Sequence, residues 1–223
     1  MPGRRRLDQE LLARGLVSSL GEAREVVEAR RVFVSGAPAV NASMLVARGA
    51  GIRIGRRGRF VSRGGDKLAG ALTDFGLAAA GKRCLDVGAG SGGFTDCLLL
   101  EGAREVVAVD VGYGQFDWKL RNDPRVRLFE RTNIRTVASE VLGSPFELVV
   151  ADLSFISLLV VLERLVAAAA HGGDLLLLVK PQFEAPRRDV GQGGVVSDPQ
   201  VWEETLAAVS ADLAARGFGT AGA

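Results

Sequence analysis

The stretch RCLDVGAGSGGF, residues 83–94, constrains the fold of this 223-residue chain more than any other part of it. It begins with a short apolar run, 84–87, which is typical of a buried β-strand, and continues into a turn made almost entirely of glycine. Glycine lacks a Cβ atom, so such a backbone can turn tightly and approach a ligand closely. The apolar residues 95–100 predict a helix whose first N–H groups are free. The stretch therefore predicts a strand, a nucleotide-type binding loop and a helix.

The chain from residue 62 onwards alternates strand and helix signals. Near-continuous apolar runs, which are typical of parallel strands covered on both faces, occur at 83–87, 106–111, 126–130, 146–153 and 174–180. Helical patterns occur at 67–75, 92–102, 115–121, 133–142, 156–170 and 199–216. Strands that alternate with helices build a doubly wound parallel sheet. We therefore predict an α/β, Rossmann-like domain over residues 62–223.

Positive charge is concentrated at the amino end of the chain. Residues 1–67 hold 14 Lys and Arg against 6 Asp and Glu, a net charge of +8, whereas the remaining residues hold 14 against 20, a net charge of −6. A small basic segment joined to an acidic domain indicates a module that binds a polyanion. The arginines that we assign to RNA phosphate contacts are Arg4, Arg5, Arg6, Arg14, Arg24, Arg30 and Arg31.

The same segment has the pattern of a compact α+β module. The predicted elements are two helices, 6–16 and 20–30, two strands, 32–34 and 51–54, and a linker, 55–59. Ser18 and Ser19 are the cap candidates of the second helix, and Glu22 lies three residues after Ser19, as in a capping box. We predict a small RNA-binding domain over residues 4–61.

Composition excludes several classes of protein. No apolar run reaches the roughly 18 residues of a membrane-spanning helix, and no signal-peptide pattern follows the basic start. We therefore expect a cytoplasmic protein. The single histidine leaves no ordinary set of zinc ligands, and the two cysteines, Cys84 and Cys97, fall on a predicted strand and helix as packing residues. We expect no metal site.

The glycine loop permits three interpretations. Residues 88–93 satisfy G-x-G-x-x-G, and Asp110 ends the next strand about 20 residues later, which suits an NAD-dependent oxidoreductase. In an S-adenosylmethionine site, Asp86 would instead pair with the cationic amino-acid end of the ligand, and Asp110 with its ribose hydroxyls. Since the charge of Asp86 would lie close to a pyrophosphate, the sequence favours S-adenosylmethionine. A structural turn without a ligand is the third interpretation.

Three charged residues converge on the loop. Asp152 and Lys180 end the fourth and fifth predicted strands, so both lie at the carboxyl edge of the sheet, beside Gly88. Lys67 begins the helix before the first strand and can reach the same cleft. One such residue is more often part of a surface ion pair, but three beside a glycine loop indicate a site.

Ordered motifs extend over nearly the whole chain. It resembles the TlyA family, within the FtsJ-like ribose methyltransferases, in SRGGDKL, DVGAGSGGF, VVAVDVGYGQ, ERTNIR, ADLSFISL and LVKPQFE. Residues 6–54 resemble an S4-like RNA-binding domain in RLDxxLxxxGL, a Ser-x-x-x-Ala helix and VxVxG. The resemblance implies an enzyme that methylates ribose 2′-hydroxyls of cytidines in ribosomal RNA with S-adenosylmethionine. Some family members carry a haemolysin label, for which the sequence offers no physical reason.

The resemblance also implies a Lys-Asp-Lys-Glu catalytic tetrad, of which Lys67, Asp152 and Lys180 are three members. A ribose hydroxyl is a poor nucleophile, so a lysine with a depressed pKa has to take its proton. We assign Lys180 as this base. Lys67 is expected to lower the pKa of Lys180 by like-charge repulsion, and Asp152 to orient the ammonium groups.

The fourth tetrad member, a Glu on a late strand, has no match in this sequence. The glutamates nearest to its place, Glu184, Glu203 and Glu204, lie in other contexts. We therefore expect a sheet truncated after its fifth strand. An RNA-binding protein with a catalytically impaired methyltransferase domain is the alternative to an active enzyme.

Two further assignments concern the cofactor and a long loop. The residues assigned to the cofactor are Asp86, Gly88, Gly90, Ser91, Gly92, Gly93, Phe94, Asp110 and Asn133. Asn133 is expected either near the adenine of the cofactor or as the N-cap of the next helix. The loop 181–199 is expected either as a lid or RNA-contact loop over the cleft or as a disordered connection.

Overall fold

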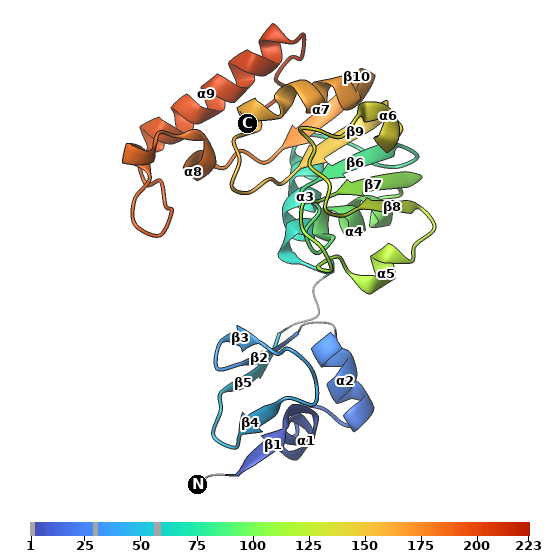
Figure 1. The fold of residues 1–223 in the computed structure, drawn as a ribbon, viewed down its shortest axis with the longest axis vertical. Helices are drawn as coiled ribbons and strands as arrows, with labels where there is room; N and C mark the ends of the chain where they lie inside the picture. Colours follow the sequence, from blue (N-terminus) through green and yellow to red (C-terminus); the bar gives the residue numbers. More distant parts are fainter. Residues whose placement is uncertain (1–2, 29–30, 56–58) are drawn as a thin grey trace. The chain divides into compact units, whose positions relative to one another are not determined.

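Buried apolar side chains form separate cores in two parts of the chain. The computed structural model describes residues 3–28, 31–55 and 59–223. It divides into two units, Met1–Arg59 and Phe60–Ala223, and the first of these is the blue part of Figure 1. One core lies in the smaller unit and two lie in the larger unit, one on each face of its sheet. The boundary predicted from the sequence falls two residues later.

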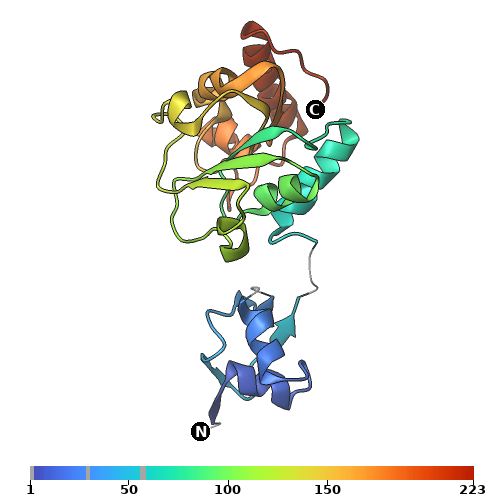
Figure 2. The same ribbon diagram turned by 90° about the vertical axis from the view of Figure 1, so that its right-hand side faces the viewer.

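The smaller unit packs two helices against short antiparallel strands. Its elements are β1 (Arg4–Arg6), α1 (Leu7–Ala13), α2 (Leu20–Glu28), β2 (Val32–Val34), β3 (Ala37–Pro38), β4 (Leu45–Ala47) and β5 (Ile52–Ile54). β1 pairs with β4, and β2 lies between β3 and β5. Leu7, Leu11, Ala23 and Val32 are fully buried between them. Figure 2 shows α1 and α2 packed side by side within this unit.

The predicted start of the first helix was wrong, whereas the cap of the second was confirmed. Arg6 belongs to strand β1, and α1 begins one residue later. The Glu22 amide donates to Ser19 Oγ at 3.1 Å, and the Glu22 carboxylate accepts from the amide and hydroxyl of Ser18, each at 2.6 Å. These bonds satisfy groups at the start of α2 that have no partner within the helix.

The larger unit is built on a parallel sheet. Its strands are β6 (Arg83–Val87), β7 (Glu105–Val109), β8 (Val126–Phe129), β9 (Phe146–Ala151) and β10 (Ala169–Leu177), in the order β10-β9-β6-β7-β8. Each pair of neighbours is parallel. The predicted α/β, Rossmann-like architecture is confirmed. Parallel strands in this order place their carboxyl ends at one edge, where open α/β sheets bind ligands.

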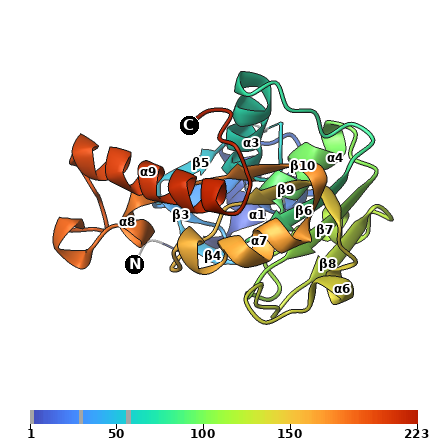
Figure 3. The same cartoon turned by 90° about the horizontal axis from the view of Figure 1, so that it is seen from above.

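Alternate residues of the strands face opposite helical layers. Cys84, Val106 and Val150 pack toward α3 (Arg63–Asp74) and α4 (Gly93–Leu100). Leu85, Val107 and Val149 pack in the other core, which includes residues of α6 (Ser139–Leu142), α7 (Leu162–Ala168) and α9 (Pro199–Ala215). Figure 3 shows α3 and α4 on one side of the sheet and α6 and α7 on the other. The sheet is covered on both faces, as its apolar strands require.

Several predicted elements are shorter in the structure. The segments 115–121 and 133–142 contain only the short helices α5 (Trp118–Arg121) and α6. The predicted helix 156–170 is a 3-10 turn, η1 (Leu158–Val160), followed by α7, and it ends where Ala169 pairs with Phe146. The predicted loop 181–199 contains α8 (Pro181–Glu184) and the 3-10 turn η2 (Arg187–Asp189). Within the described ranges, no helix is long and apolar enough to cross a membrane.

Candidate active site

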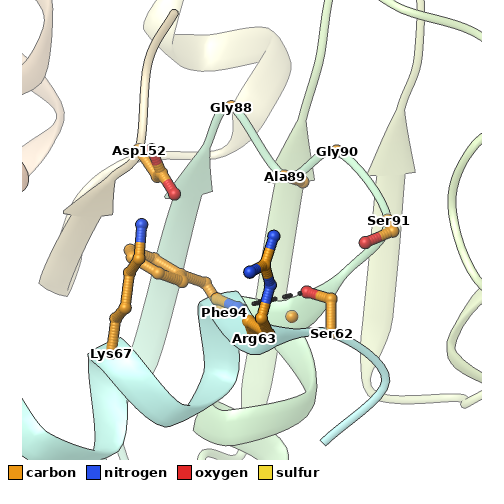
Figure 4. Close-up of a pocket in the computed structure, with 11 residues that line it drawn as sticks. Ser62, Arg63, Lys67, Gly88, Ala89, Gly90, Ser91, Phe94 and Asp152 are labelled. Carbon is orange, nitrogen blue, oxygen red and sulfur yellow. Dashed lines mark hydrogen bonds between the residues drawn. The ribbon is translucent and has the colours of Figure 1, made fainter. Parts of the chain in front are cut away.

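A pocket of about 450 Å³ lies at the carboxyl ends of β6 and β9. Its lining residues, drawn in Figure 4, are Ser62, Arg63, Gly64, Lys67, Gly88, Ala89, Gly90, Ser91, Gly93, Phe94 and Asp152. Most come from the glycine loop after β6 and from the first turns of α3. The volume lies within the range of about 300 to 1,000 Å³ that small-ligand sites occupy.

Two glycines of the loop allow neighbouring segments to approach the backbone. Gly88 has a φ of +86°, and a Cβ atom there would lie 2.6 Å from the carbonyl oxygen of Asp152. A Cβ atom on Gly93 would collide with Ser62 Oγ. A side chain at either position would therefore push the loop away from Asp152 or from the start of α3. The glycine loop is therefore narrow, with Asp152 on one side and the start of α3 on the other.

Asp110 follows β7 and holds the glycine loop through its carboxylate. Its Oδ2 accepts a hydrogen bond from the Gly90 amide at 2.7 Å, and its Oδ1 accepts one from the Gly112 amide at 2.6 Å. In a dinucleotide site the amides of such a loop face the pyrophosphate. Here the Gly90 amide already has an anionic partner from the protein.

Asp86 is fully buried in β6, and its side chain does not line the pocket. Thr95 Oγ1 donates to its Oδ2 at 2.7 Å, whereas its Oδ1 has no hydrogen-bond partner among the described residues. The pKa of Asp86 is raised to about 7, mainly by burial and also by the nearby charges of Asp152 and Asp110, against the opposing effect of the Thr95 hydrogen bonds. The sequence predicted a contact with the cationic end of a ligand, but the structure places this carboxyl below the pocket surface.

Asp152 and Lys180 form an ion pair beside the loop. Lys180 Nζ lies 2.5 Å from Asp152 Oδ1 and donates a hydrogen bond to Ser154 Oγ at 2.9 Å. The Asp152 amide donates to the Val87 carbonyl at 3.0 Å, which fixes the residue directly after β9. Lys180 lies three residues beyond the end of β10, not within the strand as predicted.

Lys67 approaches the same carboxylate from α3. Figure 4 shows its ammonium group and the Asp152 carboxylate pointing toward one another. The structure therefore brings Lys67, Asp152 and Lys180 together around one point, as we expected from the strand order. Lys67 and Asp152 line the pocket. Lys180 is not among the lining residues, but it forms an ion pair with Asp152.

Sequence reasoning missed Arg63, Ser62 and Ser154. Ser62 is the N-cap of α3, where its hydroxyl accepts from the Gly64 amide at 3.3 Å. Arg63 lies four residues before Lys67, a spacing that places both side chains on one face of a helix. Figure 4 shows the Arg63 side chain directed into the pocket. This spacing within SRGGDKL was a signal that pointed to Arg63.

Some residues assigned to the cofactor lie outside the pocket lining. Of the predicted set, Gly88, Gly90, Ser91, Gly93 and Phe94 line the pocket, but Asp86, Gly92, Asp110 and Asn133 do not. Asn133 is exposed in the turn after β8, where its Oδ1 accepts from the Arg135 amide at 3.0 Å. It therefore caps a turn, not the long helix that was predicted there.

Two of the arginines assigned to RNA bind groups within their own domain. Arg6 makes two hydrogen bonds to Asp8, at 2.7 and 3.1 Å. Arg14 pairs with the buried Glu10 at 2.9 Å and donates to the Ala50 carbonyl at 2.7 Å. These guanidinium groups hold α1 and its neighbours together. Both side chains already have partners within the domain, and phosphate contact by them stays a prediction.

The remaining arginines of the set differ in their surroundings. Arg5 lies 3.6 Å from a Glu10 carboxylate oxygen, and Arg31 donates to a backbone carbonyl at 3.1 Å. Arg4 and Arg24 are exposed. Arg30 lies outside the described residues. Arg4 and Arg24 are thus the members of the set whose charge is most accessible to a partner.

Comparison with known proteins identifies both parts of the chain. Residues 60–222 match the family described as FtsJ-like methyltransferase, and residues 5–52 match the family described as S4 domain. A relative from Mycobacterium tuberculosis, named 16S/23S rRNA (cytidine-2′-O)-methyltransferase TlyA, is 50% identical over 212 residues, which cover 94% of this chain and 79% of the relative. The chain belongs to the TlyA family. The resemblance inferred from the sequence motifs is confirmed.

Other TlyA-like proteins share the fold under a different name. Hemolysin A from Brachyspira hyodysenteriae is 37% identical over 202 residues, covering 90% of this chain and 84% of the relative. A solved structure from Streptococcus thermophilus, described as a hemolysin, has 36% identity and a TM-score of 0.69, and covers 95% of this chain and 78% of that one. Names in the TlyA family therefore divide between a methyltransferase and a hemolysin.

Proposed function

We propose that this member of the TlyA family transfers a methyl group from S-adenosylmethionine to the ribose 2′-hydroxyl of cytidine in 16S or 23S ribosomal RNA. The observation that carries the proposal is the convergence of Lys67, Asp152 and Lys180 on one edge of the glycine-loop pocket. The relative from Mycobacterium tuberculosis, whose name states this reaction, supports the choice of substrate.

The pocket fits S-adenosylmethionine better than a dinucleotide. The Gly90 amide already binds the Asp110 carboxylate, and Asp86 is buried close enough for Asp152 and Asp110 to influence it. Acidic groups around a glycine loop favour a ligand with positive charge and disfavour a pyrophosphate. S-adenosylmethionine carries a sulfonium and an ammonium group and supplies, when bound, an electrophilic methyl group. The glycine loop that includes Gly88 and Gly93 would hold S-adenosylmethionine.

Lys180 is the proposed general base. Lys180, once its ammonium group has given up a proton, would accept the proton of the ribose 2′-hydroxyl, while bound S-adenosylmethionine would supply the methyl group and leave as the neutral thioether. Asp152, whose Oδ1 lies 2.5 Å from Lys180 Nζ, fixes the position of this group together with Ser154, whose hydroxyl oxygen accepts a hydrogen bond from it. Lys67, whose ammonium group points toward Asp152, adds a second positive charge. Positioning of the hydroxyl supplies most of the rate enhancement.

The S4-type domain, residues 4–61, supplies affinity for RNA. Its exposed Arg4 and Arg24 contact phosphates, and Arg63, at the start of α3, attracts the phosphates of the target nucleotide toward the pocket. Contacts of this kind release counterions from the RNA, so they weaken as the salt concentration rises.

Replacement of the base tests the catalytic assignment. We expect Lys180→Ala to abolish tritiated methyl transfer to ribosomal subunits and to leave the affinity for S-adenosylmethionine within a few fold, because Lys180 does not line the pocket. Lys82→Ala is the matched control, since Lys82 forms a similar pair with Asp174 at 2.8 Å before β6. Normal methylation by Lys180→Ala would show that the base has been assigned wrongly.

Calorimetry separates the proposed function from its rivals. The full chain should bind S-adenosylmethionine and not reduced NAD, whereas an oxidoreductase would give the reverse result. Binding of S-adenosylmethionine and RNA without any methyl incorporation would favour an RNA-binding protein with an impaired methyltransferase domain.

A further inference from the structure

Glu184 connects the two loops that carry Asp152 and Lys180. It is the last residue of α8, four residues after Lys180. Its Oε2 accepts a hydrogen bond from Ser157 Oγ at 2.5 Å, and its Oε1 accepts one from the Leu158 amide at 2.7 Å. Both carboxylate oxygens are thus used to bind the start of η1, in the segment that follows Asp152.

The loop after β9 has little other support at its tip. Phe155 is 93% exposed and has a φ of +65°, which is uncommon for a residue with a side chain. Its ring contacts Phe183 of α8, with centroids 5.4 Å apart. Leu158, in contrast, is buried in the core and anchors the far end of the loop. The conformation between Asp152 and Leu158 therefore depends on contacts with α8.

α8 depends on the same contacts. It has four residues, and Lys180 is its N-cap. An isolated single turn of helix is unstable in water, so tertiary contacts must hold it. Within α8, Glu184 makes the charge-assisted hydrogen bonds to the opposite loop, and such bonds are stronger than neutral ones. Loss of the carboxylate would therefore loosen α8, which also packs against α9, and would loosen Lys180 with it.

We infer that Glu184 is a positioning residue for the methyl-transfer reaction, which keeps Lys180 against Asp152 by tying α8 to η1. The inference rests on the proposed function, because it assigns Glu184 a role only through Lys180. Glu184 is not a substitute for a tetrad glutamate: it acts on the backbone and hydroxyl of the neighbouring loop, and its oxygens are occupied there.

The test compares three variants of the full chain. Glu184→Ala removes both hydrogen bonds. Glu184→Gln keeps them, because the Gln carbonyl can accept from Leu158 and its amide can donate to the Ser157 hydroxyl. Glu203→Gln, at an exposed position of α9, controls for the loss of a surface charge. For each variant we would measure kcat and KM for methyl transfer to ribosomal subunits, and amide hydrogen exchange over residues 153–160.

We expect Glu184→Ala to lower kcat by about 10- to 100-fold, the effect of misplacing a reacting group by about 1 Å, with KM for S-adenosylmethionine unchanged. Exchange at Leu158 should become faster. Glu184→Gln should restore kcat to within about threefold and restore slow exchange, by retaining hydrogen bonds of comparable geometry.

Three results would overturn the inference. They are an unchanged kcat in Glu184→Ala, an equal loss in Glu184→Gln, which would indicate charge and not position, and unchanged exchange at Leu158 in Glu184→Ala. A native chain that transfers no methyl group would instead overturn the proposed function, so the two failures are distinguishable.

Discussion

Three aspartates end or follow neighbouring strands, and each has a different role because its surroundings differ. Asp86 is buried and its pKa is raised to about 7, Asp110 binds backbone amides of two loops, and Asp152 pairs with a lysine. What distinguishes them is their position along the strands: Asp86 pairs with Ala108 and Val150 inside the sheet, whereas Asp110 and Asp152 lie two residues further on, beyond the carboxyl ends of their strands.

The buried state of Asp86 predicts a pH dependence of stability. Its pKa is raised from 3.8 to about 7 on folding, so between these values the native state keeps a proton that the unfolded state has lost. Stability therefore falls as pH rises through this window and becomes constant above it. Asp86→Asn cannot titrate. Relative to the native chain it should gain stability from pH 5 to 7, by at most about 2.7 kcal/mol, since one proton over two pH units is worth about 1.36 kcal/mol for each unit.

Urea unfolding at several pH values measures this difference. Asp74→Asn, at an exposed position of α3, controls for the general effect of removing a carboxyl group. A stability difference between Asp86→Asn and the native chain that does not change with pH would show that Asp86 is ionised in the native state.

The sequence was sufficient to predict part of the site at the level of single residues. Lys67 and Asp152 could be placed because each belongs to an element whose end is fixed by the strand order. The burial of Asp86 could not be predicted, since it depends on Thr95 and the closure of α4 over the sheet. Glu184 gave no signal, because its partners lie on a different loop, 26 and 27 residues away.

At the scale of elements, the strands of the larger unit were predicted where an apolar run extends over four or more residues. β6 to β9 were placed within two residues because apolar runs identify buried strands. The strands β1, β3 and β4, of two or three residues, were not predicted, whereas β2 and β5, which have three residues each, were. The alanine-rich start of β10 was assigned to a helix, because alanine favours helices, but pairing with β9 decides its conformation.

The two groups of arginines in the small domain should respond differently to substitution. Arg14→Ala leaves the buried Glu10 without its closest partner, so it should destabilise this domain by about 2 to 4 kcal/mol. Arg24→Ala should change stability by less than about 0.5 kcal/mol. It should weaken RNA binding and reduce the slope of log K against log salt by about 1.

Denaturant unfolding and salt-dependent binding measure the two effects on the same variants. If Arg24→Ala left the salt slope unchanged, Arg24 would not contact a phosphate. If Arg14→Ala were as stable as the native domain, the hydrogen bonds of Arg14 would contribute nothing to folding.

At the scale of the whole chain, each unit buries a hydrophobic core of its own. Parts with separate cores can unfold separately. The charge asymmetry that the sequence showed follows the same division, because the basic residues belong mainly to the smaller unit and the acidic site residues to the larger one. In the proposed function, RNA affinity belongs to the smaller unit and cofactor binding to the larger one.

Scanning calorimetry of the full chain should therefore resolve two transitions. S-adenosylmethionine, at about 100 times its Kd, should stabilise the larger unit by about 2.7 kcal/mol. It should leave the transition temperature of the smaller unit unchanged. Arg14→Ala should lower only the transition temperature of the smaller unit. A single transition that responds to both the ligand and the substitution would contradict independent unfolding.

The Gly90 amide donates a hydrogen bond to Asp110, so it is not available to an anion that competes with the cofactor for the glycine loop. A ribosomal RNA substrate carries a phosphate at every nucleotide, and cells contain abundant free nucleotides. A loop with vacant amides would be inhibited by these anions, because helix starts and glycine turns attract them. Here a carboxylate of the protein occupies the Gly90 amide in advance. The polyanionic substrate can therefore approach without its own phosphates acting as inhibitors of cofactor binding.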